Sequence, residues 1–307
     1  MRITDIQVGR LSLPLAHPFK TALRTVERLE DVVVRVVGEN GLVGYGEAPP
    51  TAVITGDTIP SILCAIEEYI KPAIAGMDLM DLDAVMERLD GSMVHNTSPK
   101  AAVDMALYDL WGRTLGKPLY QLLGGAKTAF ETDLTISVNP VEEMVRDALE
   151  ARGRGFSILK IKVGKDPALD VERIAAIRKA VGPAVKLRVD ANQGWTAAES
   201  VSIIKAMEDK GLNIELVEQP VAARDFEGLK AVTAQVDTPI LADEAVFSPA
   251  DALHIIETHA ADYLNIKLMK TGGIHNALKI CEAAEKNGVK CLIGCMLESQ
   301  IAVAAAA

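Results

Sequence analysis

Apolar and polar positions follow one pattern up to about residue 125 and another after it. Apolar residues alternate with polar ones between Met1 and Phe19, which predicts an opening strand. An irregular stretch is expected at 17–27. Strands expected at 31–37 and 42–47 flank Glu39-Asn40-Gly41, a hairpin signal because Asn and Gly tolerate positive φ. Helical periodicity predicts helices at about 57–75, 80–90 and 99–115, the last opened by Ser98-Pro99.

From Glu131 onward, short strand-like runs alternate with helical patterns. The runs lie at 131–138, 156–163, 185–190, 214–218, 238–243, 262–267 and 289–295, and helices are expected between them, for example at 168–181, 196–210 and 273–287. The runs are apolar along their length, as in parallel strands covered on both faces. Successive βα units with right-handed crossovers favour a barrel over an open sheet.

The sequence therefore predicts an α/β fold, a modified TIM-type (β/α) barrel with an N-terminal α+β capping domain. Gly124-Gly125 marks the expected boundary, giving a capping domain at 1–125 and a barrel domain at 126–307. A closed barrel has eight strands, whereas seven strand patterns are present before the helix-like end at 301–307. We therefore expect the last barrel strand to be missing from this chain.

Composition narrows the classes of function. The formal net charge of −10 argues against nucleic acid, whose phosphates need a basic face, and against an anionic membrane surface. No apolar run is long enough to cross a bilayer, and the N-terminus lacks a signal-peptide layout. The four cysteines contain no CxxC pair and are expected to be buried, reduced thiols of a cytoplasmic protein: Cys64, Cys281, Cys291 and Cys295.

Charged residues end five consecutive barrel strands. In a β/α barrel the catalytic side chains lie at the C-terminal ends of the strands. The expected strands end in Lys160-Ile-Lys162, Asp190-Ala-Asn192, Glu218-Gln-Pro220, Asp243-Glu244 and Lys267. Charge on five strands in a row indicates a functional site at this rim.

Asp190, Glu218 and Asp243 lie on neighbouring strands, so their carboxylates should converge and repel. An all-oxygen ligand set without His or Cys suits Mg²⁺ before Mn²⁺ or Ca²⁺. The alternative is a ring of carboxylate–lysine salt bridges without a metal. Asn192 and Glu244 are expected to support the ligands from behind.

Lys160 and Lys162 are two apart on one strand, so both point into the barrel. Two ammonium groups roughly 7 Å apart repel by about 2.4 kcal/mol at an effective dielectric constant of about 20, which should lower a lysine pKa toward that of a usable base. Lys267 lies four strands away, hence on the opposite side of an eight-stranded ring. Two bases on opposite sides of a metal-held substrate could remove a proton from one face and return it to the other.

These motifs resemble the muconate-lactonising subgroup of the enolase superfamily, and the resemblance extends to Gly44-Tyr-Gly46-Glu47. Sites of this superfamily use a Lys or His base with Mg²⁺ to stabilise an enediolate. A mandelate-racemase-like member would offer a histidine near the end of the seventh strand. Here that segment reads Gly294-Cys-Met-Leu-Glu298, so the lysine on the sixth strand decides the subgroup.

A finer resemblance is to the L-Ala-D/L-Glu epimerases, which act on the murein dipeptide. It implies that 18–25 is a mobile capping loop whose Arg24 pairs with the substrate's glutamate side chain, that 49–56 is a second capping loop, and that Thr135 contacts substrate. These epimerases carry an Asp-x-Asp on the eighth strand that holds the dipeptide's ammonium, and the chain ends before that position. Lys270 is expected at the surface, at the start of a helix.

The resemblance implies a Mg²⁺-dependent dipeptide epimerase in which Lys162 and Lys267 exchange the proton, and Lys160 tunes Lys162 and binds the substrate carboxylate. Glu298 would support the site, and the partners would be a small dipeptide or acylamino acid and further copies in a homo-oligomer. The alternatives are N-acylamino-acid racemase, o-succinylbenzoate synthase or muconate cycloisomerase on the same residues. A non-catalytic metal-binding relative is the alternative of another class.

Overall fold

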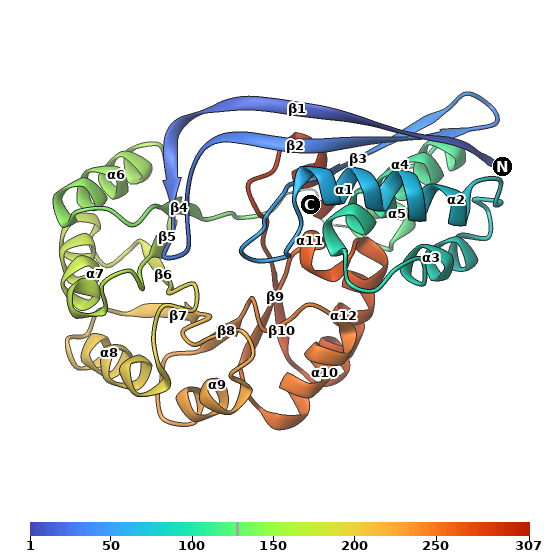
Figure 1. Ribbon diagram of the computed structural model, residues 1–307. Coiled ribbons are helices and arrows are strands. Elements are labelled where there is room, and N and C mark those ends of the chain that lie inside the picture. The colour runs from blue at the N-terminus through green and yellow to red at the C-terminus, as the bar shows by residue number, and fades with distance from the viewer. Residues whose placement is uncertain (127–128) are drawn as a thin grey trace.

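A long antiparallel hairpin runs across the top of the molecule (Figure 1). The computed structural model describes residues 1–126 and 129–307. β1 (Ile3–Lys20), β2 (Thr25–Gly38) and β3 (Val43–Ala48) form one sheet in the order β1-β2-β3, which confirms the opening strand and the β2–β3 hairpin. The prediction of an irregular loop at 17–27 is wrong in its length. The loop is shorter, because β1–β2 pairing continues to Phe19 with Val26 and Lys20 with Thr25. A register shift between Pro14 and Phe19 accommodates the prolines, which cannot donate to a ladder.

The tip of this hairpin lies on the barrel. The Val138 backbone N–H donates to the Lys20 carbonyl (3.2 Å), and Lys20 Nζ donates to Asn139 Oδ1 (2.7 Å). Residues 21–24, the turn between β1 and β2, are thereby held beside the first barrel strand.

Helices complete the capping domain close to the expected positions. The helix expected at 57–75 is made of three consecutive segments, α1 (Ile59–Cys64), the π-helix η1 (Ala65–Ile70) and α2 (Lys71–Ile74). α3 (Leu82–Asp90), α4 (Thr97–Leu115) and the short α5 (Leu119–Leu122) follow. α4 is buried on almost all sides and lies directly against β3.

Two glycines of β3 allow that close contact. A Cβ at Gly44 would lie 1.9 Å from the Ala106 carbonyl oxygen, and one at Gly46 would lie 1.8 Å from the Ala102 carbonyl oxygen. Only residues without a side chain let the β3 backbone pack on the α4 backbone at this distance.

The barrel strands are β4 (Leu134–Ile136), β5 (Ile158–Lys162), β6 (Lys186–Asp190), β7 (Ile214–Glu218), β8 (Ile240–Ala242), β9 (Tyr263–Ile266) and β10 (Lys290–Ile293). The helices between them are α6 (Val141–Gly153), α7 (Pro167–Val181), α8 (Ala197–Asp209), α9 (Phe226–Thr233), α10 (Pro249–Thr258), α11 (Leu268–Thr271) and α12 (Ile274–Lys286). All seven expected strands and the three named helices are confirmed, within a few residues at each end.

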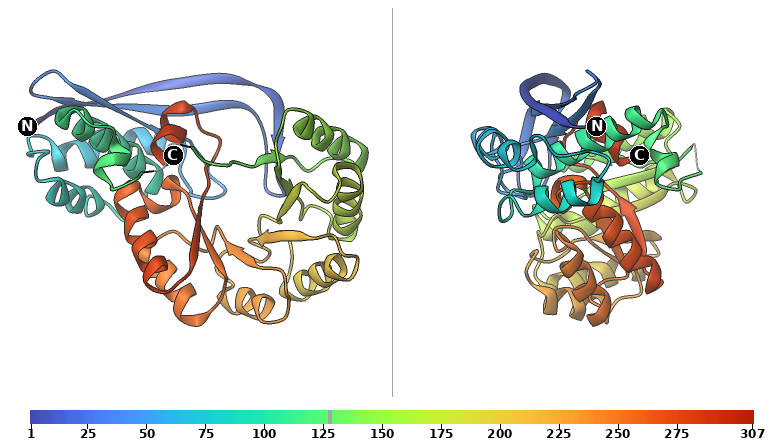
Figure 2. Two further views of the ribbon diagram at one scale, coloured as in Figure 1. Left: turned by 180° about the vertical axis from the view of Figure 1, so that it is seen from behind. Right: turned by 90° about the vertical axis from the view of Figure 1, so that its right-hand side faces the viewer.

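The seven strands form one parallel sheet in chain order, curved into an arc with the helices outside (Figures 1 and 2). Within the described residues, β4 and β10 each pair on one side only. After β10, α13 (Gln300–Ala306) packs against β3 and α4 of the capping domain. The fold is therefore the expected modified TIM-type (β/α) barrel under an antiparallel cap, with seven barrel strands within the described residues.

Two carboxylates of the capping domain hold it on the barrel. Asp104 of α4 accepts hydrogen bonds from the Ile274 (2.6 Å) and His275 (3.2 Å) backbone N–H groups at the start of α12. Glu47 of β3 accepts from Ser299 N (2.7 Å) and Ser299 Oγ (2.6 Å) at the start of α13. Helix N-termini favour such anionic partners, so the cap has a defined position over the strand ends.

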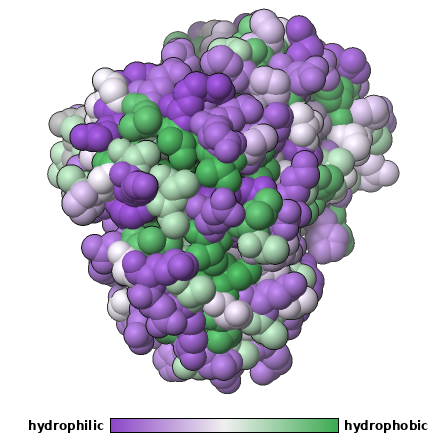
Figure 3. Space-filling view, turned by 90° about the vertical axis from the view of Figure 1, so that its left-hand side faces the viewer, coloured by the Kyte–Doolittle hydropathy of each residue, from purple (hydrophilic) through white to green (hydrophobic). Residues whose placement is uncertain are grey.

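The four cysteines are free, but the expectation that they are buried is wrong. Cys64 and Cys295 are exposed, whereas Cys281 of α12 and Cys291 of β10 are half-buried and pack against the edge of the apolar core. In the part of the chain that the structure describes, no helix is both long enough and apolar enough to span a membrane. The face that carries α6 and α7 is mainly polar, with apolar residues scattered between charged ones (Figure 3).

Gly46→Ala should destabilise the protein, because the new methyl group would overlap the Ala102 carbonyl and force β3 off α4. We expect a loss of about 1–3 kcal/mol or more, the usual cost of overpacking, measured by urea unfolding. Gly9→Ala is the matched control on β1, where a Cβ would meet no atom within 4 Å. Equal stabilities of the two variants would contradict the role given to Gly46.

Candidate active site

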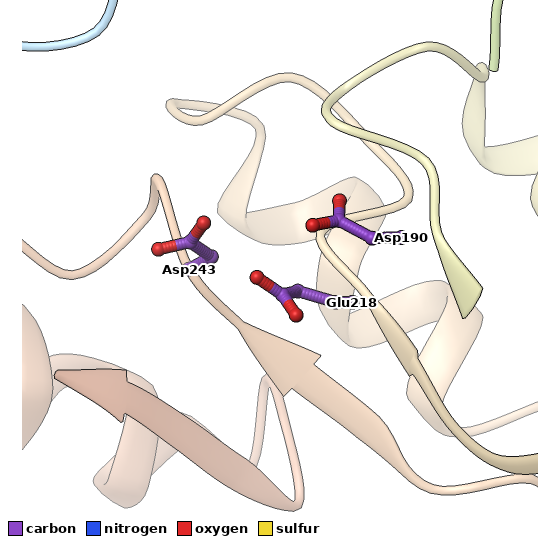
Figure 4. Close-up of side chains that lie close together, drawn as sticks. All are labelled: Asp190, Glu218 and Asp243. Carbon is purple, nitrogen blue, oxygen red and sulfur yellow. The ribbon is translucent and has the colours of Figure 1, made fainter. Parts of the chain in front are cut away.

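The three acidic residues predicted to converge do so. Asp190 ends β6, Glu218 ends β7 and Asp243 follows β8, and their carboxylates face one another at the mouth of the arc (Figure 4). One oxygen from each lies within 4.8 Å of the others, and all three residues are at most 2% exposed. The geometry is that of a site for one hard cation bound by oxygen ligands.

Lysine ammonium groups surround these carboxylates. Lys160 Nζ lies 2.9 Å from Asp190 Oδ2 and 2.6 Å from Glu218 Oε2, and Lys162 Nζ lies 2.6 Å from Asp190 Oδ2. Lys267 Nζ lies 2.6 Å from Asp243 Oδ2. Lys162 comes from β5 and Lys267 follows β9, so the strands that carry the carboxylates lie between them.

The pKa of one lysine in this cluster, Lys160, differs from the expected one. Burial alone would lower the pKa of Lys160, but Asp190, Glu218 and Asp243 outweigh burial and raise it well above its ordinary value. The expected lowering of a lysine pKa on β5 is therefore not found at Lys160. Asp243 likewise raises the pKa of Lys267 against its burial.

At Glu218, the central carboxylate, the effects that oppose ionisation outweigh the attraction of the neighbouring lysines. Burial, reinforced by Asp190, raises the pKa of Glu218 to about 8. Three acids this close do not all ionise easily, and a divalent cation between them would remove that penalty.

Asn192 and Glu244, predicted to support the metal ligands, lie next to the carboxylates. The Asn192 backbone N–H donates to Asp190 Oδ1 (2.9 Å), and its Nδ2 donates to Glu244 Oε1 (3.1 Å). Burial raises the pKa of Glu244 to about 7. Among the described residues, Asn192 Oδ1 and Glu244 Oε2 have no hydrogen-bond partner although they are buried. Both residues line the pocket above the carboxylates, so they offer polar atoms to whatever binds there.

That pocket lies between cap and barrel. Lys162 and Lys267 line it together with residues of both capping loops. The full lining is Phe19, Thr21, Leu23, Arg24, Val53, Ile54, Lys162, Asn192, Glu244, Lys267, Cys295, Met296 and Leu297. Arg24 and both expected capping loops therefore face the site. Arg24 is half-buried, and burial lowers the pKa of its guanidinium, with Asp31 opposing. Within the described residues no carboxylate lies within 4.0 Å of it, which leaves the guanidinium available to a ligand.

Thr135 and Glu298 are at the margins of the site. Thr135 is the register partner of Lys160 across β4 and β5, so its side chain is on the same face of the sheet. Glu298 Oε1 accepts a hydrogen bond from the Met296 backbone N–H (2.7 Å), next to the pocket wall. Burial raises its pKa to about 7.

Sequence reasoning misplaced Lys270 and overlooked Asn265. Lys270 is fully buried, with its Nζ 2.7 Å from Asp243 Oδ1, so the prediction of a surface residue is wrong. Asn265 Nδ2 donates to Glu218 Oε1 (2.9 Å). The spacing of two residues from Lys267 could have placed Asn265 on the inner face, whereas the short helix that turns Lys270 inward has no comparable signal.

Two family models match this chain. Residues 4–124 match the mandelate racemase / muconate lactonizing enzyme N-terminal domain, and residues 143–307 match the enolase C-terminal domain-like family. Among characterised proteins, the L-Ala-D/L-Glu epimerase of Clostridium acetobutylicum is 55% identical over 100% of this chain and 86% of its own length.

Solved structures agree with this match. A substrate-liganded complex of the L-Ala-D/L-Glu epimerase from Bacillus subtilis superposes with a TM-score of 0.98 at 53% identity, over 100% of this chain and 86% of that one. The dipeptide epimerase of Enterococcus faecalis, complexed with Mg and L-Leu-L-Tyr, superposes with a TM-score of 0.97 at 44% identity and the same coverage. With both its domains matched and its carboxylates and lysines at the strand ends, the chain belongs to the mandelate racemase/muconate lactonizing enzyme family of the enolase superfamily.

Proposed function

We propose that this protein is a Mg²⁺-dependent dipeptide epimerase that inverts the glutamate α-carbon of L-Ala-D/L-Glu. The observation that carries the proposal is one pocket lined by Lys162, Lys267 and Arg24, with three converging carboxylates beneath it. The similarity to characterised dipeptide epimerases over the whole chain supports the same reaction.

Asp190, Glu218 and Asp243 would hold the cation. They fit it because they supply oxygen ligands only, are buried, and have mutual repulsion that a dication would relieve. When bound, Mg²⁺ would stabilise the negative charge that develops on the substrate carboxylate as the α-proton leaves.

Lys162 and Lys267 would carry the proton. In the structure their ammonium groups are paired with Asp190 and Asp243. Lys162 on β5 and Lys267 after β9 would face the substrate from opposite sides, because the strands that carry the carboxylates lie between them. One lysine then accepts the α-proton in its neutral form, and the other, protonated, donates to the opposite face of the same carbon, which inverts the configuration.

Lys160, the other lysine of β5, would bind the substrate carboxylate, with Thr135 beside it on β4. Arg24 would pair with the glutamate side chain of the substrate, because its planar fork can bind a carboxylate at two points. Asn192, Glu244 and Glu298 would hold these groups in place.

Arg24 also separates this function from its rivals. The Enterococcus faecalis relative was solved with a dipeptide whose side chains carry no carboxylate, so dipeptide epimerases differ in side-chain preference. A pocket arginine with no protein partner among the described residues favours an acidic side chain here. N-acylamino-acid racemase, o-succinylbenzoate synthase and muconate cycloisomerase remain alternatives on the same lysines, and a non-catalytic metal-binding protein is the remaining one.

We further propose capping and barrel domains at 1–125 and 126–307, and a homo-oligomer by analogy with other barrels of this kind. A cytoplasmic location fits four free cysteines.

Glu218→Gln should weaken Mg²⁺ binding at least about tenfold, since it replaces an anionic ligand by a neutral one of the same shape. Isothermal titration of the metal-free protein measures this. Glu215→Gln is the matched control, because Glu215 lies on the same strand in a surface ion pair with Arg188. Unchanged affinity in Glu218→Gln would rule out the carboxylate site.

L-Ala-L-Glu incubated with Mg²⁺ and the protein in D₂O should lose its glutamate α-proton signal by NMR while the L,D diastereomer appears. EDTA should abolish both changes, and Lys162→Ala should abolish the appearance of the L,D diastereomer, because inversion needs a lysine on each face of the α-carbon. Exchange with N-succinyl amino acids alone would keep the two-lysine reaction and exclude the dipeptide. Absence of exchange with every substrate would leave the non-catalytic alternative.

Arg24→Met should reduce kcat/KM for L-Ala-L-Glu by about 10- to 100-fold, the factor that corresponds to losing a hydrogen bond to a charged group. The same variant should change kcat/KM for L-Ala-L-Leu much less. Arg28→Met is the control on the same hairpin, because Arg28 is exposed and bonds Ser12. Equal losses on both dipeptides would argue against pairing between Arg24 and the side-chain carboxylate.

A further inference from the structure

Lys270 is a fully buried lysine that does not line the substrate pocket. It lies in α11, the single turn of helix that follows Lys267, and the turn directs its side chain back beneath the strand ends. Its Nζ donates to the backbone carbonyls of Asp243 and Asn265, the latter at 2.9 Å, and lies 2.7 Å from Asp243 Oδ1. A buried ammonium group needs such partners, and here they join the end of β9 to the segment after β8.

The two oxygens of the Asp243 carboxylate are thereby divided between two lysines. Lys267 Nζ lies 2.6 Å from Oδ2 and belongs to the pocket wall, whereas Lys270 lies on Oδ1 from the buried side. Oδ1 is buried and receives no well-directed hydrogen bond from the described residues, so this ion pair is its principal contact.

The two lysines also differ in how firmly they are held. Lys267 Nζ donates only to Asp243 Oδ2 among the described residues, so it can leave when that oxygen takes another partner. Lys270 is tied to two backbone carbonyls in addition to the carboxylate and has no exposed surface. It therefore stays in place when Lys267 moves.

We propose that Lys270 is a positioning residue that fixes the Asp243 carboxylate, keeps Oδ1 engaged and leaves Oδ2 as the oxygen that binds the divalent cation. This inference rests on the proposed metal site and deepens it. Partners of metal-binding carboxylates are expected to orient the ligand in this way.

Charge and orientation make opposite predictions for the removal of Lys270. A fixed ammonium group next to Asp243 repels a dication, so if its charge were all that mattered, a neutral replacement would tighten metal binding. If Lys270 orients the ligand, the same replacement frees Asp243 to rotate and weakens binding.

The test is Mn²⁺ binding to the metal-free protein, followed by the electron paramagnetic resonance signal of free Mn²⁺. Lys270→Met, which keeps the length of the side chain, should weaken binding by about 10- to 100-fold. Lys100→Met is the matched control: Lys100 is also buried and also donates to two backbone carbonyls, Asp90 (2.8 Å) and Met93 (2.5 Å), but contacts no proposed ligand. Binding by Lys270→Met that equals or exceeds that of the unaltered protein would overturn the inference.

A second measurement does not depend on whether Lys270→Met folds. In a crystal structure of the unaltered protein with Mn²⁺, the ion should lie on Asp243 Oδ2 with Lys270 Nζ still on Oδ1. An ion on Oδ1, or on both oxygens, would overturn the assignment. Failure of the unaltered protein to bind Mn²⁺ would instead remove the proposed metal site, so the two failures are distinct.

Discussion

The structure depends on how three buried carboxylates are compensated at the mouth of the barrel. Asp190, Glu218 and Asp243 are out of contact with water and within 4.8 Å of one another. Desolvation and mutual repulsion both oppose their ionisation, and removing the partner of such a buried charge commonly costs about 3–5 kcal/mol. The surrounding lysines meet this need through ion pairs with all three carboxylates.

That compensation links stability to chemistry. The ammonium groups of Lys162 and Lys267, the proposed proton carriers, pair with carboxylates that would hold the cation. The expected metal site and the alternative ring of salt bridges therefore share one set of residues. Lys160 shows why: its raised pKa comes from the acids that a cation would neutralise.

The capping domain supplies what the barrel lacks. Gly44 and Gly46 allow β3 to lie on α4, and Glu47, next in sequence, reaches the start of α13. The β1–β2 hairpin then extends over the mouth and brings Arg24 to the lysines. The pocket is therefore lined by residues of both the cap and the barrel, and in the proposed function recognition of the side chain falls to the cap and proton transfer to the barrel.

The sequence by itself determined the strands, their order and the residues at their ends. Apolar runs and the two-residue period of a strand are local properties, so Lys160, Lys162 and the three carboxylates could be placed on one rim before any coordinates. The tertiary structure alone decided that the β1–β2 hairpin stays paired to Lys20, that Cys64 and Cys295 are exposed, and that Lys270 is buried beneath Asp243. These features depend on contacts between segments far apart in the chain, or on a single helical turn that reverses a side chain. Neither leaves a periodic pattern of hydrophobic and polar residues.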